Sequence, residues 1–526
     1  MPNDILTATA SPVVEVAAGK LRGATRGGIH AFKGIPYGAS TAGANRFMPP
    51  QAPASWAGVR DALEYQGHAP QSPARAEKRH ELATILGPAD TTPEGEDCLT
   101  LHVWTPGLDN AKRPVMVWLH GGAFAYGSGN RAVTAGDNLA RRGDAVVVSV
   151  NHRLNILGFL HLAEAGGDRF AHSGNAGMLD LVAALRWVRD NIAAFGGDPG
   201  NVTIFGESGG GGKVSVLLAM PEARGLFHRA VIQSGATIRV STRERATALA
   251  DAVLKEFGFA RGDGVRLQDV PFARLLAAIA PASRAVGPTR WKLLDRYDFG
   301  PVVDGADLPA QPFDPAAPGI ADDIPLLIGG TREEAAFFLA DDDEVWHGRI
   351  SEESLRRRVA AVAGDQVDRV LAAYLHGTPG DRLIAALTGS NFWIRTVMLA
   401  ERKAARAGLG VGRAPVYMYS LDWQSPAHGG RLKAHHAMDL PFVFDNTDVP
   451  DTTKGAAGAA ELSAVMSAVW AQFARTGSPQ TAALPAWPAY TSAERATMVF
   501  DSACCVAQDP DRDARLAWAG VVAASP

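Results

Sequence analysis

The stretch that most constrains the fold is NVTIFGESGGGGKV, at residues 201–214. An apolar, partly β-branched run, residues 202–205, ends there in a glycine turn, and a helical pattern follows at once. Gly206, Ser208 and Gly210 fill the pattern Gly-x-Ser-x-Gly. In so sharp a turn, side chains two residues before and after the serine would collide, so both positions need glycine. The stretch therefore predicts a nucleophile elbow between a strand and a helix, with the hydroxyl of Ser208 exposed.

The helix after Ser208 predicts a position beside the hydroxyl where an anion is favoured, because free N–H groups and the positive end of the helix dipole point there. The pentapeptide does not establish catalysis alone, since glycine makes up 56 of the 526 residues. An ordinary glycine-rich turn is the alternative. An exposed serine also needs a general base, an orienting carboxylate and donors for the developing oxyanion.

Two of these three partners follow apolar runs. The segment HGGAF, residues 120–124, comes directly after the run 115–119, and its small residues let backbone N–H groups approach a carbonyl. A plain glycine turn is again the alternative. After the run 324–328, the segment GGTREEAAFF brings Glu333 and Glu334 to the carboxyl end of a predicted strand. Active sites of open α/β sheets lie at that edge, so either carboxylate is a candidate acid.

The neighbouring His435 and His436 are the candidates for the base. They follow the predicted strand at residues 416–420, and the order serine, acid, histidine is the one expected for such a site. An isolated histidine is more often a surface or structural residue. Two adjacent histidines would also suit a metal ion, but no thiolate or carboxylate cluster with zinc spacing accompanies them. We therefore expect neither a metal nor a cofactor.

The rest of the chain predicts an α/β protein with a large, mostly parallel sheet covered on both faces. The strand-like runs are residues 99–104, 115–119, 145–150, 202–205, 230–233, 324–328 and 416–420, and helical patterns occupy 178–195 and 459–475. Residues 13–37 indicate short strands at a sheet edge, and 51–95 indicate surface loops. Two mostly helical segments, about 242–296 and 351–406, are expected as insertions that wall the pocket within a single domain, 1–526.

Charge and composition narrow the partners. The net charge is −4 with both signs interspersed, so no basic stripe is present to bind nucleic acid. We find no signal-peptide pattern and no run near the ~18 apolar residues that a membrane helix needs. Three cysteines, Cys98, Cys504 and Cys505, offer no disulfide framework. We expect a cytoplasmic protein without a membrane partner; its oligomeric state, monomer or dimer, stays open.

With these pieces assembled, the chain resembles the type B carboxylesterases, the α/β-hydrolase family that includes para-nitrobenzyl esterases and cholinesterases. The resemblance covers nearly the whole chain and rests on FKGIPYG (32–38), EDCLTLHVWTP (96–106), HGGAF (120–124), NHRLNILGFL (151–160), FGESGGG (205–211), IQSGA (232–236) and HAMDLPFVF (436–444). It implies the α/β-hydrolase fold and a serine hydrolase that cleaves small-molecule carboxylic esters through an acyl-enzyme. The alternatives are an amidase or carbamate hydrolase with the same triad and, less favoured, a non-catalytic binding protein.

The resemblance assigns one residue to each catalytic role. It implies Ser208 as nucleophile, Glu334 rather than Glu333 as acid, and His436 rather than His435 as base. Ser234 and Glu207 take supporting roles. The remaining implied positions are the oxyanion N–H groups of Gly122, Ala123 and Gly209, and the pocket aromatics Phe124, Phe337 and Phe338.

Three features depart from the family pattern. The residue after the nucleophile is usually alanine but here is Gly209, so we expect Gly209→Ala to keep activity and to stabilise the protein by up to ~1 kcal/mol. The acid motif usually ends in glycine but here ends in Ala335. Residues 66–95 contain no aromatic residue, and Cys98 has no upstream partner. A choline ester specialist is therefore not expected.

Overall fold

The structure is a computed structural model that describes residues 11–71, 84–287, 298–408, 410 and 414–523. Its centre is an 11-stranded sheet in the order β16-β15-β14-β13-β10-β9-β7-β8-β6-β4-β3. The strands are β3 (Ala24–Arg26), β4 (Ile29–Pro36), β6 (Thr100–Thr105), β7 (Arg113–Leu119), β8 (Val146–Val150), β9 (Gly197–Glu207), β10 (Arg229–Gln233), β13 (Leu326–Thr331), β14 (Val416–Leu421), β15 (Ala496–Phe500) and β16 (Cys505–Gln508). Each of the seven predicted runs coincides with one of these strands.

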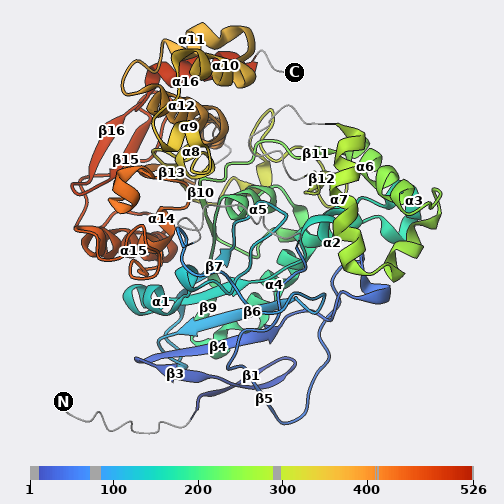
Figure 1. Ribbon diagram of the computed structural model, residues 1–526. Coiled ribbons are helices and arrows are strands. Elements are labelled where there is room, and N and C mark those ends of the chain that lie inside the picture. Colours follow the sequence, from blue (N-terminus) through green and yellow to red (C-terminus); the bar gives the residue numbers. More distant parts are fainter. Residues whose placement is uncertain (1–10, 72–83, 288–297, 409, 411–413, 524–526) are drawn as a thin grey trace.

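The strands from β8 through β15 run parallel, and the pairs at both edges run antiparallel. The predicted short strands near the start of the chain are confirmed. β1 (Val13–Val16) and β2 (Gly19–Arg22) form a hairpin that pairs with β5 (Val59–Asp61) in a separate small sheet, while β3 and β4 complete the edge of the large one. Figure 1 shows these strands at the lower side of the molecule.

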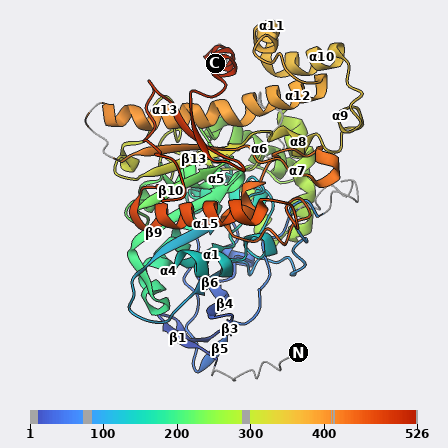
Figure 2. The ribbon, with the colours of Figure 1, turned by 90° about the vertical axis from the view of Figure 1, so that its left-hand side faces the viewer.

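The sheet is buried on both faces, because successive side chains of its central strands enter different cores. In β7, Val115 and Val117 join one core, and Met116 and Trp118 join the other. α4 (Ala176–Asn191), α5 (Gly209–Leu217) and α13 (Ile394–Gly408) belong to the first core, whereas α1 (Asp137–Gly143), α14 (Asp439–Val443) and α15 (Ala459–Thr476) belong to the second. Figure 2 shows α1 and α15 together on the side turned toward the viewer.

Both predicted helices of the central layers end where glycine allows a left-handed turn. α4 continues through a 3-10 turn to Phe195, and Gly196 follows with φ 77°. α15 ends at Thr476, and Gly477 follows with φ 81°; the N–H of Gly477 donates to the carbonyl of Phe473 at 2.8 Å. Both helix predictions are confirmed.

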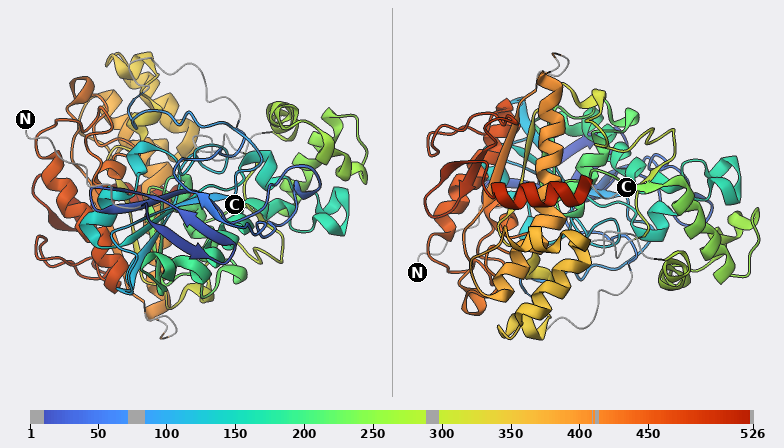
Figure 3. Two further views of the ribbon diagram at one scale, coloured as in Figure 1. Left: turned by 90° about the horizontal axis from the view of Figure 1, so that it is seen from below. Right: turned by 90° about the horizontal axis from the view of Figure 1, so that it is seen from above.

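The two predicted insertions are helical and lie apart from each other. The first holds α6 (Arg243–Glu256) and α7 (Phe272–Val286), and its residues 288–296 fall outside the described part of the chain. The second holds α10 (Glu352–Ala363), α11 (Val367–Leu371), α12 (Pro379–Thr388), a π-helical turn (Gly389–Trp393) and most of α13. Figure 3 (right) shows the two groups on different sides of the molecule. α16 (Arg512–Ala523), which packs on the second group, was not among the predicted helices.

Several short elements connect these layers: α2 (Asn155–Phe159), α3 (Ala163–Gly166), α8 (Ala335–Phe338), α9 (Asp343–Trp346), β11 (Ser241–Thr242) and β12 (Val302–Val303). One longer helical stretch, Pro379–Arg406, is long and apolar enough to cross a membrane by length and composition. The prediction that no stretch approaches this property is wrong for that helix. Since 78% of its most apolar window is buried inside the protein, core packing accounts for the composition.

Candidate active site

Ser208 occupies a strained turn between β9 and α5. Its φ of 55° and ψ of −122° lie where side-chain-bearing residues are rarely found. A Cβ added to Gly206 would lie 2.4 Å from the carbonyl carbon of Gly210, and one added to Gly210 would lie 2.0 Å from the carbonyl oxygen of Leu119. The collisions that the sequence predicted are therefore present, and the turn has the geometry of a nucleophile elbow.

Glu334 and His436 form a buried pair at the carboxyl ends of β13 and β14. The Nδ1 atom of His436 lies 2.5 Å from Oε2 of Glu334, and the two residues are 5% and 1% exposed. The other carboxylate oxygen of Glu334 accepts the N–H of Thr331 at 2.9 Å. The carboxylate is thus held by the end of its own strand while it orients the imidazole.

The neighbours of this pair face elsewhere. A carboxylate oxygen of Glu333 accepts hydrogen bonds from the side chain of Gln424 and from the N–H of Ala434. The Nδ1 atom of His435 lies 2.7 Å from the carbonyl oxygen of His436. Of the two acids and two histidines that the sequence offered, Glu334 and His436 lie side chain to side chain.

The second nitrogen of His436 faces the nucleophile turn. Nε2 lies 3.1 Å from Oε1 of Glu207, the residue before Ser208, but this oxygen has no aligned hydrogen bond among the described residues. Nor do the described residues include a hydrogen bond between Ser208 and His436. Such bonds often tighten only when substrate binds. The role of His436 as the base for Ser208 stays a prediction.

Three buried carboxyl groups surround this one imidazole and alter its titration. Burial opposes the charge on His436, but Glu207 and Glu334 raise its pKa to about 9. Burial also raises the pKa of Glu207 to about 8 and that of Asp439 to about 6. Asp439 accepts hydrogen bonds from Gln233 and Tyr419. The neighbouring carboxylates therefore stabilise the positive charge that His436 gains when it accepts a proton.

Ser234 lies beside the acid but makes no hydrogen bond to it. A Cβ added to Gly330 would lie 3.2 Å from the hydroxyl of Ser234 and 2.6 Å from Oε1 of Glu334. The buried hydroxyl has no hydrogen-bond partner among the described residues. The supporting role of Ser234 therefore stays a prediction.

The segment after β7 presents backbone N–H groups toward the elbow. Gly122 and Ala123 have φ values of 87° and 53°, and neither of their N–H groups donates a hydrogen bond within the described residues. The N–H of Gly209 belongs to the first turn of α5, which has no acceptor inside the helix. The resemblance implies these three groups as the oxyanion donors, and that role stays a prediction.

One prediction about these donors is wrong. A Cβ added to Gly209 would lie 2.2 Å from both Cα and the carbonyl oxygen of Ala123. These are backbone atoms, which cannot rotate away, so Gly209→Ala should displace the segment or the helix start rather than stabilise the protein. The family usually has alanine at this position, but in this chain the backbone of Ala123 fills the space that an alanine side chain would need.

Aromatic rings surround His436. The ring centroids of Phe337, Phe338 and Phe392 lie 6.0, 5.0 and 5.0 Å from that of the imidazole. Phe392 was missed because it comes from the π-helical turn of the second insertion, which no local motif marks. Phe124 instead packs edge-on against Phe159, with centroids 5.4 Å apart.

Lys213 is a second residue that the motif search missed. It lies in α5, its side chain is 0% exposed, and its Nζ donates to the carbonyl of His120 at 2.7 Å. The signal was present in the sequence as one lysine within the otherwise uncharged stretch GGGGKVSVLLAM.

Among the described residues, no group of three or more His, Cys, Asp or Glu is arranged to hold a metal ion.

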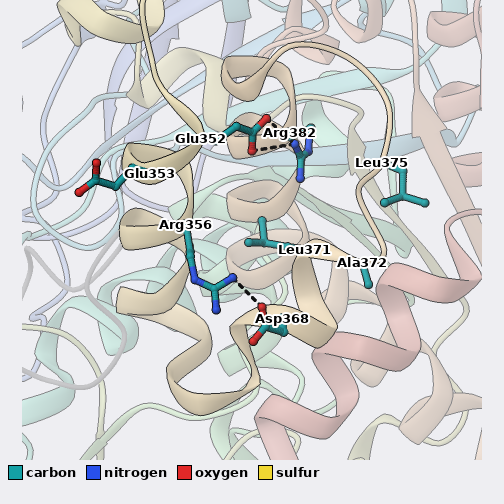
Figure 4. A pocket seen from close by; sticks show the side chains of 8 residues that line it. All are labelled: Glu352, Glu353, Arg356, Asp368, Leu371, Ala372, Leu375 and Arg382. Carbon is teal, nitrogen blue, oxygen red and sulfur yellow. Dashed lines mark hydrogen bonds and ion pairs between the residues drawn. The ribbon is translucent and has the colours of Figure 1, made fainter.

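A surface groove lies elsewhere, over α10 to α12 (Figure 4). Two ion pairs cross it, Arg356 with Asp368 and Arg382 with Glu352, and Leu375 is 70% exposed at its rim. None of its lining residues belongs to the elbow, the acid–base pair or the donor segment. The groove therefore contributes nothing to the site around Ser208.

Comparison with known proteins agrees with this geometry. Residues 10–518 match the model of the carboxylesterase family. The para-nitrobenzyl esterase of Bacillus subtilis (strain 168) is 38% identical over 96% of this chain and 97% of its own. The phenmedipham hydrolase of Pseudarthrobacter oxydans is 35% identical over 95% and 97%. The crystal structure of a Geobacillus stearothermophilus carboxylesterase superposes with a TM-score of 0.81 at 38% identity, over 96% of this chain and 99% of that one. This chain belongs to the carboxylesterase family, and it is a serine ester hydrolase with the α/β-hydrolase fold.

Proposed function

We propose that Ser208, His436 and Glu334 carry the ester hydrolysis. The observation that supports this most is the buried 2.5 Å contact between His436 and Glu334 beside the strained turn of Ser208. His436 takes the proton of the serine hydroxyl as Oγ attacks the ester carbonyl, and Glu334 orients the imidazole and stabilises its cation. The alcohol leaves with the proton returned by His436. Water then attacks the acyl-enzyme by the same route and releases the acid.

The backbone donors act on the oxygen of the substrate carbonyl. In the proposed step, the N–H groups of Gly122, Ala123 and Gly209 stabilise the oxyanion that forms when Ser208 attacks. Glu207 strengthens the basicity of His436 through its 3.1 Å contact, and Ser234, which lies beside Gly330 as Glu334 does, would support the acid. No step in this scheme calls for a cofactor or a metal.

The rings beside His436 favour uncharged esters with small or aromatic groups. Phe337, Phe338 and Phe392 would contact the group bound next to the imidazole. Relatives of this chain are named para-nitrobenzyl esterase, phenmedipham hydrolase and cocaine esterase. Their names make a panel of aryl and alkyl esters, extended by amides and carbamates, the appropriate substrates for separating an esterase from an amidase or carbamate hydrolase.

The setting of the enzyme is part of the same proposal. We take residues 1–526 as a single domain that acts in the cytoplasm on a small molecule, as a monomer or dimer and without nucleic acid or membrane as partner. The interspersed charges and net charge of −4 support the absence of a nucleic-acid partner. Cell fractionation and size-exclusion chromatography with light scattering test it.

The test of the triad is initial-rate hydrolysis of para-nitrophenyl butyrate by the wild type and Ser208→Ala, with a chelator present. Loss of the nucleophile should lower kcat on the order of 10⁶-fold. Ser467→Ala is the matched control, because this buried serine of α15 has no hydrogen-bond partner among the described residues. Equal rates for the wild type and Ser208→Ala would refute the proposal.

A further inference from the structure

Lys213 is an unusual residue for the interior of this site. Its side chain is 0% exposed, and α5 otherwise contains no charged residue. Removing an ammonium group from water is costly unless its hydrogen bonds and charge are matched, so a buried lysine calls for a specific partner. Burial lowers the pKa of Lys213 to about 7, against the opposing effect of Glu207. In either protonation state Nζ keeps an N–H group to donate.

The glycines before Lys213 give its side chain a clear path to the donor segment. Side chains on a helix point back toward its N-terminus, over the residues three and four positions earlier. For Lys213 those residues are Gly210 and Gly209, which have no side chains. The stem can therefore run along the start of α5, and Nζ reaches the carbonyl of His120 at 2.7 Å.

That carbonyl marks the beginning of the donor segment, which is held at both ends. At its start, the carbonyl of His120 accepts the hydrogen bond of Lys213. At its other end, the carbonyl of Phe124 accepts the N–H of Asn155 at 2.7 Å. Between the two anchors, the N–H groups of Gly122 and Ala123 stay unused within the described residues. The anchors hold the carbonyls so that the donors between them face the elbow.

The surroundings of Lys213 fit a donor that acts on the backbone and not on the substrate. Burial and the charge of Lys213 lower the pKa values of the stacked His120 and His152, so both rings stay neutral. Nζ lies 5.9 Å from the ring centroid of Phe124. No contact joins Nζ to Ser208 or His436 among the described residues.

We propose that Lys213 is a positioning residue for the oxyanion donors: its Nζ holds the carbonyl of His120 and thereby fixes the N–H groups of Gly122 and Ala123 on the ester oxygen. This inference rests on the proposed function. Gly209 is the complementary feature, since the absence of its side chain admits the backbone of Ala123 against the helix. The chain thus uses a glycine and a lysine, one helical turn apart, to seat and anchor the segment.

The test compares Lys213→Met with Lys403→Met. Lys403, in α13, is also buried and donates to backbone carbonyls, those of Ala321 and Asp322, but far along the chain from the donor segment. The readouts are kcat and KM for para-nitrophenyl butyrate and Ki for an aryl alkyl trifluoromethyl ketone, which binds as an oxyanion adduct of the serine. Loosened donors weaken the adduct and the transition state but not substrate binding.

For Lys213→Met we expect kcat to fall about 10²-fold and Ki to rise by a similar factor, with KM within about threefold of the wild type. Lys213→Gln, which keeps a neutral donor, should have kcat and Ki values between those of the wild type and Lys213→Met. Lys403→Met should keep wild-type kcat and Ki. Thermal unfolding and circular dichroism establish that each variant is folded.

Several results would overturn the inference. Wild-type kcat and Ki in Lys213→Met would do so. A lower kcat with unchanged Ki would also do so, because it would mean that the charge of Lys213 acts on His436 and not on the oxyanion donors. If neither Lys213→Met nor Lys213→Gln folds, the lysine is a folding determinant and not a positioning residue. A wild type without ester hydrolysis would refute the proposed function itself, whereas an active wild type with an unaffected Lys213→Met refutes only this inference.

Discussion

Two regions of the molecule gather charged side chains, and they do so under opposite conditions. At the carboxyl ends of β9, β13 and β14, Glu207, Glu334 and His436 are each no more than 5% exposed. In the groove over α10 to α12, Arg356 and Asp368 form an ion pair whose side chains are 53% and 76% exposed. The first group has lost its water and depends on a few protein contacts. The second is solvated whether or not the pair forms.

This difference in burial determines what the charges do to the pKa values of their neighbours. Around His436, burial alone would lower the pKa of the imidazole, but the charges of Glu207 and Glu334 raise it to about 9. Burial raises the pKa of Glu207 to about 8. A catalytic base needs such a specific environment, and perturbed groups of this kind concentrate at functional sites. An exposed ion pair gains little, because water screens it. Burial and geometry, and not the number of charges, distinguish the site.

The largest effect on kcat should come from substituting the acid Glu334 and not its neighbour Glu333. We expect Glu334→Gln to lower kcat about 10⁴-fold, because the neutral amide no longer stabilises the imidazolium of His436. Glu333→Gln is the matched control, since its carboxylate contacts Gln424 and Ala434 instead, and it should stay within about tenfold of the wild type. Steady-state kinetics with para-nitrophenyl butyrate measure both. A larger loss in Glu333→Gln than in Glu334→Gln would reverse the assignment.

The next effect concerns the close packing at the helix start. Gly209→Ala should lower kcat about 10²-fold and the free energy of unfolding by about 1–3 kcal/mol, because its Cβ would meet the backbone of Ala123. Gly212→Ala, in the same helix, meets the hydroxyl of Thr237 at 2.9 Å rather than backbone, and it should cost less in both. Kinetics and urea unfolding provide the comparison. An active, stabilised Gly209→Ala would contradict the packing described here.

A smaller effect should appear in the pH profile. His436 acts as a base only when neutral, that is, above its pKa, and the charge of Glu207 raises that pKa. Glu207→Gln removes this charge, so the acid limb of kcat/KM should move to lower pH. Glu401→Gln, whose carboxylate pairs with Arg495 away from the site, should leave the limb in place. A shift of the acid limb of Glu207→Gln to higher pH would show that Glu207 does not raise the pKa of His436.

The smallest effect should come from the groove. Arg356→Ala breaks the exposed pair with Asp368, and kcat/KM should stay within about twofold of the wild type. The thermal unfolding midpoint should be unchanged within the scatter of the measurement. Loss of most ester hydrolysis in this variant would mean that the groove, and not only the buried site, acts on the substrate.

The sequence predicted those parts of the site whose geometry is local. The elbow at Ser208 was read from a short motif, and a side chain at Gly206 would indeed meet the backbone of Gly210 four residues on, although the space at Gly210 is closed by Leu119 of a neighbouring strand. Strand ends likewise brought Glu334 and His436 into consideration, because parallel strands end at one edge. The strands and the two central helices were predicted for the same reason, since their periodicity is contained within each segment.

The parts that failed depend on contacts between distant segments. The tolerance of alanine at Gly209 depends on the backbone of Ala123, which approaches it only in the folded chain. Phe392 reaches His436 from the second insertion, and Lys213 reaches His120 across 93 positions of the sequence. Neither distance is encoded by a local pattern. The segment Pro379–Arg406 was predicted as helical, but the reason for its apolar composition, burial inside the protein, depends on the folded chain.

The most direct test of the account is to locate the covalent adduct. The wild-type protein is treated with diethyl para-nitrophenyl phosphate, which phosphorylates an activated serine and releases para-nitrophenolate, and is then analysed by intact-mass and peptide mass spectrometry. We predict one adduct per chain, located on Ser208, formed in step with the loss of ester hydrolysis and absent from Ser208→Ala. Complete inactivation with the adduct on any other residue, or one equivalent bound to Ser208→Ala, would contradict the assignment of Ser208 as the nucleophile.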